Sequence, residues 1–323
     1  MLIQDATQQA MTIAQAITLG VVEGITEYLP VSSTGHLIIV SDLLGLGESA
    51  AQRSAVDTFN IVVQGGAILA VLGLYWPRVL QMIKGLLGKD PVGLKLAINI
   101  IIAFIPAVVL GLMFNDVIEE KLFNTPSVIT ALALGGIFMI VLDKMKFKQV
   151  DTDNDPDNDP ENDITELTWK QSLFIGLMQT IAMWPGTSRS MMTIAGGVIV
   201  GLKPKQAAEF SFLLGLPTLG GACVYSLYKN LTESAELGAP NMFDTLGWTP
   251  IIVGMIVATI SAALAVRWLV SFLNKHGLAP FGYYRLVLAA LLAILIATGT
   301  VNIVPHGQVE TDAAPDSILD SND

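Results

Sequence analysis

The sequence predicts an all-α, polytopic integral membrane protein with about six full transmembrane helices and two re-entrant helical hairpins in inverted-topology repeats. The 323 residues are 52% hydrophobic and only 14% charged, whereas a soluble protein has about 25% charged residues. Several apolar runs approach the ~20 residues that cross a bilayer as a helix. Two other apolar runs are broken by polar turns, and broken helices at membrane depth must be buried in protein or line a cavity.

Six apolar runs are long enough to be full spans. The single cysteine, Cys223, lies in one of them, so one chain cannot form a disulfide. The net charge of −11 argues against a nucleic-acid partner. In chain order, we expect the spans at Phe59–Trp76, Lys95–Phe114, Val128–Leu142, Ala207–Tyr228, Pro250–Trp268 and Arg285–Val304.

The two broken runs, Met11–Tyr28 and Trp169–Trp184, each end at a polar turn that contains a proline. Each run then resumes as a short apolar helix, His36–Leu46 or Met191–Leu202. These second arms are too short to cross a bilayer. We therefore expect each broken run to turn back inside the membrane as a hairpin.

Basic residues orient this arrangement, because loops rich in lysine and arginine lie in the cytoplasm. Placing four basic groups there makes all six full spans alternate, puts both termini on the outer (periplasmic) side and brings the two hairpins in from opposite faces. Their polar turns then meet near the middle of the membrane. The four groups are Arg78 to Lys95, Lys144 to Lys170, Lys203 with Lys205, and Arg267 to Arg285.

Weak internal similarity supports two inverted repeats, an architecture known for membrane proteins with broken helices. Gly20–Glu23 matches Gly176–Gln179, and Pro30–Ser33 matches Pro185–Ser188. We expect a single membrane domain over residues 1–323. Its parts are a first repeat at about 10–142, an acidic linker at 149–166, a second repeat at about 168–304 and a disordered acidic tail at 305–323.

The acidic linker imitates the spacing of a calcium-binding loop between Asp155 and Glu166. Pro160 stands where such a loop needs its glycine, and no flanking pair of helices fits. We therefore predict a solvated, disordered linker through Asp163 rather than a calcium site.

Glu23 and Glu27 lie in an apolar run and, being four residues apart, share one helix face. Charge inside a membrane-length segment is costly and usually faces a cavity. Two carboxylates could hold a divalent cation, Mg²⁺ or Ca²⁺. One of them could instead activate a nucleophile or a water.

Three consecutive hydroxyls, Ser32, Ser33 and Thr34, precede the new helix, with His36 in its first turn. Serine and threonine cap helices, and a helix N-terminus also binds phosphate through its free N–H groups. A serine beside a base could act as nucleophile. His36 could shuttle a proton, since its ordinary pKa is about 6.5.

The second turn contains Thr187, Ser188 and Arg189, the one arginine that looks buried. A guanidinium makes bidentate contacts with phosphate oxygens. The structural alternative is an ion pair with Glu23 or Glu27, which is compatible with a phosphate role. Together the two turns suggest a site for an anion.

These turns closely resemble the undecaprenyl-diphosphate phosphatase family, whose members are also called bacitracin-resistance proteins. The similarity extends beyond the turns over most of Gly20–Ala290. It is carried by Glu23–His36 and Pro185–Ser190, and also by Gln64–Ala70, Ile105–Gly111 and Glu209–Leu214.

The resemblance implies hydrolysis of undecaprenyl diphosphate to undecaprenyl phosphate and phosphate in the bacterial plasma (inner) membrane. The product lipid is reused in peptidoglycan and cell-wall synthesis, and the activity gives bacitracin resistance. The family requires a divalent metal, which Glu23 and Glu27 would hold here. The resemblance implies catalytic roles for Glu27, Ser33, His36 and Arg189, with Glu23 in support. We expect substrate contacts from Glu23, Ser32, Thr34, Gln64, Thr187 and Ser188.

Several alternatives stay open at this point. The nucleophile is Ser33 or a water, and the base is Glu27 or His36. A polyprenyl-phosphate transporter or flippase would use the same headgroup site without cleavage. The sequence does not specify the face of substrate entry, the metal or the oligomeric state, for which a homodimer is one option.

Overall fold

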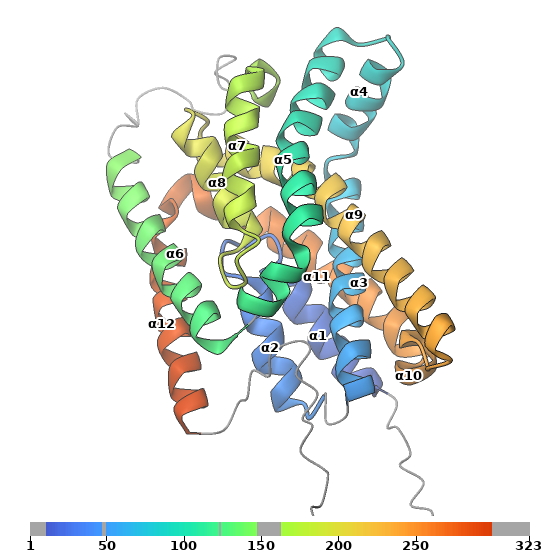
Figure 1. The fold of residues 1–323 in the computed structure, drawn as a ribbon. Helices are drawn as coiled ribbons and strands as arrows, with labels where there is room; N and C mark the ends of the chain where they lie inside the picture. Colours follow the sequence, from blue (N-terminus) through green and yellow to red (C-terminus); the bar gives the residue numbers. More distant parts are fainter. Residues whose placement is uncertain (1–10, 47–49, 123, 147–162, 299–323) are drawn as a thin grey trace, which may run out of the picture.

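The computed structural model describes residues 11–46, 50–122, 124–146 and 163–298, and within these ranges the secondary structure is entirely helical. Figure 1 shows the helices as one elongated bundle. Their bounds are α1 Ile13–Thr26, α2 Ser33–Leu43, α3 Ala50–Leu74, α4 Trp76–Leu86, α5 Pro91–Leu122, α6 Thr125–Lys146, the 3₁₀ helix η4 Ile164–Glu166, α7 Trp169–Ile181, α8 Arg189–Ile199, α9 Pro204–Leu237, α10 Met242–Leu246, α11 Trp248–His276 and α12 Ala279–Ala297.

The six predicted full spans are confirmed as helices that are long and apolar enough to cross a membrane. They are α3, α5, α6, α9, α11 and α12. Many of their large apolar side chains are exposed on the outside of the bundle, such as Leu112, Val224 and Val287. Such surfaces suit contact with lipid, and the protein is a multi-pass membrane protein.

Each predicted broken segment is a pair of short helices, α1 with α2 and α7 with α8. The two pairs are closed by the same hydrogen bonds. A threonine and a glutamine form a capping box at the first helix, and the glutamine amide then donates to a carbonyl just after the second helix, at 3.0 Å. The residues are Thr12, Gln15 and Leu44 in the first pair, and Thr168, Gln171 and Val200 in the second.

The two halves of the chain interlock. Helix α1 packs along α11, and α7 packs along α5, while α3 contacts α9 and α6 contacts α12. In Figure 1, the pair α1–α2 enters the bundle from one end and α7–α8 from the other, and their connecting turns lie together in the middle. Entry from opposite membrane faces, and the division into repeats, stay predictions.

Glycines permit the close helix crossings at equivalent places in the two halves. A side chain at Gly20 would lie 2.6 Å from the backbone oxygen of Gly254 in α11, and one at Gly176 would collide with the backbone of Ala103 in α5. Any larger residue would push each hairpin away from the long helix that supports it.

The register that we predicted between the two turns is wrong by one residue. Ser32 and Ser188 are the equivalent positions, because each caps the second helix of its pair and each has a positive φ, 73° and 77°. The match of Pro30 with Pro185 pointed to Ser33 and Ser188 instead. Capping geometry, not the shared proline, sets the alignment.

Two predictions about charged residues are also wrong. Arg285 was expected at the edge of a cytoplasmic basic group, but α12 begins at Ala279, and Arg285 is completely buried inside the bundle. Arg189 is therefore not the one buried arginine. Asp163 was expected in a solvated linker, but it caps η4 and pairs with Arg78 at 2.8 Å. Residues 147–162 of the linker, the first ten residues and the tail from 299 lie outside the described residues.

Helix α4, which we expected as part of a basic loop, anchors this end of the linker. Arg78 also pairs with Glu209 of α9 at 2.8 Å. Burial raises the pKa of Asp163, but the Thr165 N–H and the Arg78 guanidinium outweigh burial, so the pKa of Asp163 lies below its ordinary value. Lys95 of α5 pairs with Glu166. The linker end is thus held by ion pairs to α4 and α5.

Candidate active site

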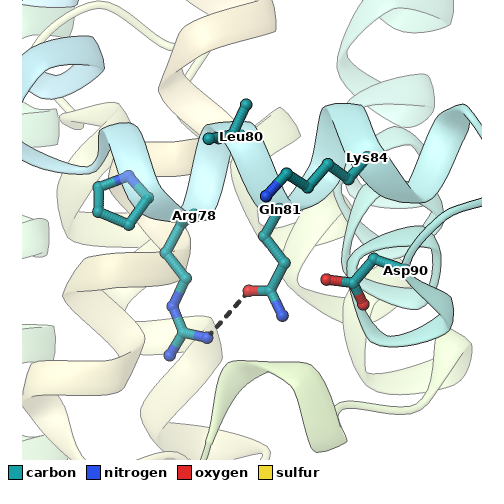
Figure 2. Close-up of a pocket in the computed structure, with 6 residues that line it drawn as sticks. Arg78, Leu80, Gln81, Lys84 and Asp90 are labelled. Carbon is teal, nitrogen blue, oxygen red and sulfur yellow. Dashed lines mark hydrogen bonds between the residues drawn. The ribbon is translucent and has the colours of Figure 1, made fainter.

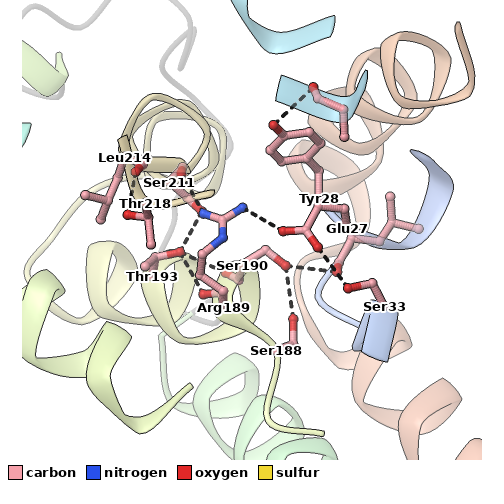
Figure 3. Close-up of polar contacts among 12 residues, drawn as sticks. Glu27, Tyr28, Ser33, Ser188, Arg189, Ser190, Thr193, Ser211, Leu214 and Thr218 are labelled. Atoms are coloured by element: carbon pink, nitrogen blue, oxygen red, sulfur yellow. Dashed lines mark hydrogen bonds and ion pairs between the residues drawn. The ribbon is translucent and has the colours of Figure 1, made fainter. Parts of the chain in front are cut away.

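The two polar turns contact each other directly. Arg189 Nη2 lies 3.2 Å from Glu27 Oε1, and the Ser190 hydroxyl donates to the carbonyl of Leu29 at 2.9 Å. Figure 3 shows the Arg189 side chain reaching across to Glu27. The prediction that the turns meet is therefore confirmed, and the structural alternative of a Glu27–Arg189 ion pair is present.

Glu27 is shared between two partners from different halves of the chain. While Oε1 pairs with Arg189, Oε2 accepts a hydrogen bond from the Ser33 hydroxyl at 2.8 Å. Glu27 and Ser33 are both buried. Because the Glu27 carboxylate already accepts a hydrogen bond from the Ser33 hydroxyl, it is placed to act as the general base for Ser33.

The Arg189 guanidinium keeps a hydrogen-bond donor that its partners among the described residues do not use. Nη1 donates to the carbonyl of Ser211 at 3.1 Å, while Nε is buried without a hydrogen-bond partner among the described residues. Its central carbon lies 5.8 Å from the ring centroid of Tyr28. Gly215 leaves room for the group, since a side chain there would lie 3.1 Å from both terminal nitrogens. Such a guanidinium can bind phosphate oxygens.

Ser33 and Arg189 are the first residues of α2 and α8, so two helix N-termini converge on the same place. Ser32 accepts from the Gly35 N–H and Ser188 from the Met191 N–H, each at 3.3 Å. Both serines therefore cap their helices, and of the three hydroxyls in which a cap was expected, Ser32 is the one that provides it. The positive ends of two helix dipoles favour an anion at this junction.

His36 is turned away from Ser33. Its Nδ1 lies 2.7 Å from the Ser32 carbonyl, which can only accept, so Nδ1 carries a proton. Its Nε2 lies 2.7 Å from the Tyr284 hydroxyl, and the two rings are stacked. No hydrogen bond joins His36 to Ser33 or Glu27 among the described residues. This geometry favours Glu27 over His36 as the base for Ser33.

Glu23 is completely buried one helical turn before Glu27, and neither of its carboxylate oxygens has a hydrogen-bond partner in the described residues. Buried polar atoms without a partner are unusual and point to a missing ligand or proton. Oxygen donors of this kind suit Mg²⁺ or Ca²⁺. The described residues contain no group of three or more acidic, histidine or cysteine side chains around one point. A cation here would therefore take further ligands from water or phosphate, as Mg²⁺ commonly does.

The remaining predicted residues differ in position. Thr34 is the second residue of α2, whereas Thr187 lies in the second turn with its side chain buried. Gln64 lies in α3, and the described contacts include no hydrogen bond from it to either turn. Sequence reasoning missed Ser211 and Tyr284, which contact Arg189 and His36. Ser211 lay within a segment of family resemblance, whereas no pattern indicated Tyr284.

A separate cavity of about 450 Å³ lies beside α4 (Figure 2). None of its lining residues belongs to the two turns, and the Arg78 guanidinium in its wall is already bound to Glu209, Asp163 and Gln81. We assign no chemistry to it. The cavity is lined by Pro77, Arg78, Leu80, Gln81, Lys84 and Asp90.

Comparison with known proteins identifies the family of this site. Residues 16–291 match the family described as bacitracin resistance protein BacA, a range that includes both turns and all six spans almost entirely. The chain belongs to the bacitracin resistance protein BacA family. The resemblance seen in the two polar turns is thereby confirmed.

Relatives of the BacA family that carry a functional name cover most of the chain. A protein of Pseudomonas fluorescens is 42% identical over 281 residues, which is 87% of this chain and 93% of that protein. One of Azotobacter vinelandii is 41% identical over 290 residues, 90% and 96% of the two chains. One of Sorangium cellulosum is 41% identical over 277 residues, 86% and 84%. All three are named undecaprenyl-diphosphatase.

Proposed function

We propose that the protein hydrolyses undecaprenyl diphosphate to undecaprenyl phosphate and inorganic phosphate. The observation that carries the proposal is the position of Glu27, whose carboxylate joins the Ser33 hydroxyl to the Arg189 guanidinium where the two turns meet. The relatives named undecaprenyl-diphosphatase support the choice of substrate.

The substrate combines a strongly anionic headgroup with a long apolar tail. Arg189 and the N-termini of α2 and α8 supply positive charge for the headgroup. Hydroxyl contacts come from Ser32 and Thr34 at the start of α2, and from Thr187 and Ser188 just before α8. Gln64 is a less direct candidate, because it lies on α3. The apolar outer surfaces of the long helices suit the tail.

In the serine scheme, the Ser33 hydroxyl passes its proton to Glu27 while its oxygen attacks the terminal phosphorus. The bond from that phosphorus to the bridging oxygen breaks, and the lipid monophosphate leaves with the bridging oxygen. A water then attacks the phosphorus of the phosphoserine, the bond from phosphorus to the Ser33 oxygen breaks, and phosphate leaves. Glu27 returns its proton to the Ser33 oxygen and accepts the proton of the attacking water, which then passes to the solvent. In the alternative scheme, Ser33 and Glu27 orient a water that attacks directly. In both schemes, Arg189 stabilises charge on the transferring phosphoryl group.

His36 supports the first turn in this scheme. Its Nδ1–H donates to the Ser32 carbonyl, and Tyr284 holds Nε2. Both bonds fix the start of α2, and with it Ser33. The proton-shuttle role expected from the sequence is the less supported one, because His36 does not contact Ser33 or Glu27.

A divalent cation, Mg²⁺ or Ca²⁺, fits beside the two glutamates. Glu23 offers two carboxylate oxygens without partners, and Glu27 lies on the same helix face. When bound, the cation would offset charge on the diphosphate. Glu23 would also keep Glu27 oriented toward Ser33.

We place the protein in the bacterial inner membrane, with both termini on the outer side, where it would recycle the lipid carrier for peptidoglycan synthesis. This activity would give resistance to bacitracin. The orientation rests on the basic groups, whose Arg78 and Lys84 lie in α4, Lys95 near the start of α5 and Lys170 at the start of α7. Helix α4 and the starts of α5 and α7 lie at the same end of the bundle (Figure 1).

The test is phosphate release from a polyprenyl diphosphate by the purified protein in detergent, where transport has no meaning. We expect release by the wild type and almost none from Arg189→Ala or Glu27→Ala. Full activity of either variant would refute the assignment. A protein that only moves the lipid between leaflets would release no phosphate. Retained turnover in Ser33→Ala would leave the water scheme and exclude the serine nucleophile.

A further inference from the structure

The last helix of the bundle reaches both turns through two adjacent residues. Tyr284 lies against His36 of the first hairpin, and Arg285 Nη2 donates to the carbonyl of Gly186 in the second turn at 2.8 Å. Gly186 stands shortly before Arg189 in that turn. Helix α12 therefore connects to the two halves of the site from outside both hairpins.

Among the described residues, Arg285 is the largest of the completely buried side chains. Besides Gly186, its acceptors among the described residues are backbone carbonyls of α6, those of Ala131 at 3.0 Å and Leu132 at 3.3 Å. The described residues place no carboxylate within ion-pair distance of it, and its Nη1 has no hydrogen-bond partner. Burying an arginine without a counter-charge is costly, and in a membrane protein such a residue is by default a candidate for function.

Helix α6 is shaped to let this guanidinium pass. A side chain at Gly135 would lie 2.5 Å from Arg285 Nη2, and one at Gly136 would lie 2.8 Å from the backbone oxygen of Gly282 in α12. The two helices therefore touch through their backbones at this crossing. Only because of these glycines can Arg285 extend across α6 to the turn behind it.

The turn that Arg285 holds is clamped on its other sides as well. Gly186, at φ 92°, is seated against α6, where a side chain would lie 2.7 Å from the Val128 carbonyl oxygen. Just before it, the indole N–H of Trp184 donates to the Ser127 hydroxyl at 2.6 Å. Arg285 completes this clamp at the carbonyl of Gly186. The start of α8, and so the direction of Arg189, follows from where the turn is fixed.

We propose that Arg285 is a positioning residue for phosphoryl transfer: it fixes the turn at Gly186 so that the Arg189 guanidinium meets the terminal phosphate. The proposal rests on the proposed phosphatase function. It assigns Arg285 no contact with the substrate. A displacement of about 1 Å in a positioned group can cost on the order of 100-fold in rate, so a small shift of the turn is enough to matter.

The first test is Arg285→Lys, which keeps the charge but loses the planar set of donors. We expect kcat to fall at least about tenfold while KM changes less than about threefold, because the loss is one of alignment in the transition state. The control is Arg267→Lys, which removes an exposed arginine from α11 and should leave kcat unchanged. A second variant, Gly135→Ala, keeps the arginine at position 285, but its added methyl group displaces the Arg285 guanidinium. We expect the same fall in kcat.

A double-mutant comparison separates positioning from a merely structural role. If Arg285 acts through Arg189, the change Arg285→Lys should cost less than about threefold in an Arg189→Lys background, because residues acting as a unit are not additive. An equal cost in both backgrounds would overturn the proposal, as would an unchanged kcat in both Arg285→Lys and Gly135→Ala. Thermal unfolding in detergent checks that the variants fold. If Arg285→Lys does not fold, the same comparison is made with Gly135→Ala in the wild-type and Arg189→Lys backgrounds. A wild type that releases no phosphate would instead contradict the proposed function itself.

Discussion

The substitution Glu27→Gln tests the centre of the site with the smallest change of shape. The glutamine keeps one oxygen that can accept from Arg189 Nη2, now 3.2 Å from Oε1. It loses the negative charge and the ability to take a proton from Ser33. Since both side chains of the Glu27–Arg189 pair are almost entirely buried, at 6% and 11% exposure, solvent screens little of this change.

The expected loss follows from two contributions. A positioned general base contributes roughly 10²- to 10⁴-fold to a rate. The charge of Glu27 also orients Arg189, so its removal adds misalignment to the lost proton transfer. We expect kcat to fall by about 10³-fold, which corresponds to about 4 kcal/mol of transition-state stabilisation.

The assay is release of inorganic phosphate from a polyprenyl diphosphate in detergent, with a saturating divalent cation. Glu233→Gln provides the matched control, because Glu233 is a surface residue of α9 that is more than half exposed. Among the described residues, it pairs with Lys229 at 3.8 Å. It should retain the wild-type kcat. A Glu27→Gln variant that is folded and within about threefold of the wild-type kcat would refute Glu27 as the base, given the range stated for such groups.

Three further predictions concern the surroundings of the site and the linker. Gly215→Ala places a carbon 3.1 Å from both terminal nitrogens of Arg189, and we expect kcat to fall roughly tenfold through misplacement. EDTA should stop phosphate release and added Mg²⁺ restore it, with Glu23→Gln raising the Mg²⁺ concentration needed for half the maximal rate. Because the pKa of Asp163 is lowered in the fold, its pair with Arg78 stabilises the protein above the unfolded pKa, and this stability is lost as the pH falls. Asp163→Asn should therefore lower the thermal midpoint at pH about 7, and less so near pH about 4.

Each of these predictions has its own control. Gly220→Ala adds a methyl group to the same helix, α9, at a place that faces open space. An equal fall in kcat in this variant would mean that Gly215→Ala acts through the helix rather than through the Arg189 guanidinium. Phosphate release that persists in full after chelation would exclude the cation. A thermal difference between wild type and Asp163→Asn that is the same at both pH values would show that the ion pair is not its cause.

The sequence was sufficient to predict the two turns because each disturbs an otherwise apolar run. Glu23, Glu27 and Arg189 stand out there, since charge at membrane depth needs a reason. The helix pairs follow from length, as α2 and α8 are both 11 residues long and cannot cross a bilayer. What brings the turns together, the packing of α1 on α11 and of α7 on α5, is a relation between distant segments and could not be predicted from local pattern.

Arg285 shows most clearly where sequence reasoning fails. An arginine at the edge of an apolar run normally marks the interface between lipid and cytoplasm. An arginine buried inside the bundle produces the same sequence pattern, so the two cases cannot be told apart from sequence. The distinguishing feature lies on another helix, where Gly135 and Gly136 open the space that the guanidinium fills. Tyr284 is missed for the same reason, because its partner His36 is distant in sequence and only the fold aligns them.

The two equivalent serines show how the site uses local strain. Ser32 and Ser188 both have a positive φ, a conformation that costs a residue with a side chain about 1–3 kcal/mol and that glycine would adopt freely. Replacing a serine cap by glycine costs only a few tenths of a kcal/mol, so stability alone favours glycine at both positions. The two serines make contacts that glycine could not: the Ser32 hydroxyl caps α2, and the Ser188 hydroxyl contacts the Ser190 hydroxyl, which donates to Leu29 of the other turn. The strain therefore lies at the junction where Glu27 must meet Arg189, which is where a fixed geometry benefits phosphoryl transfer most.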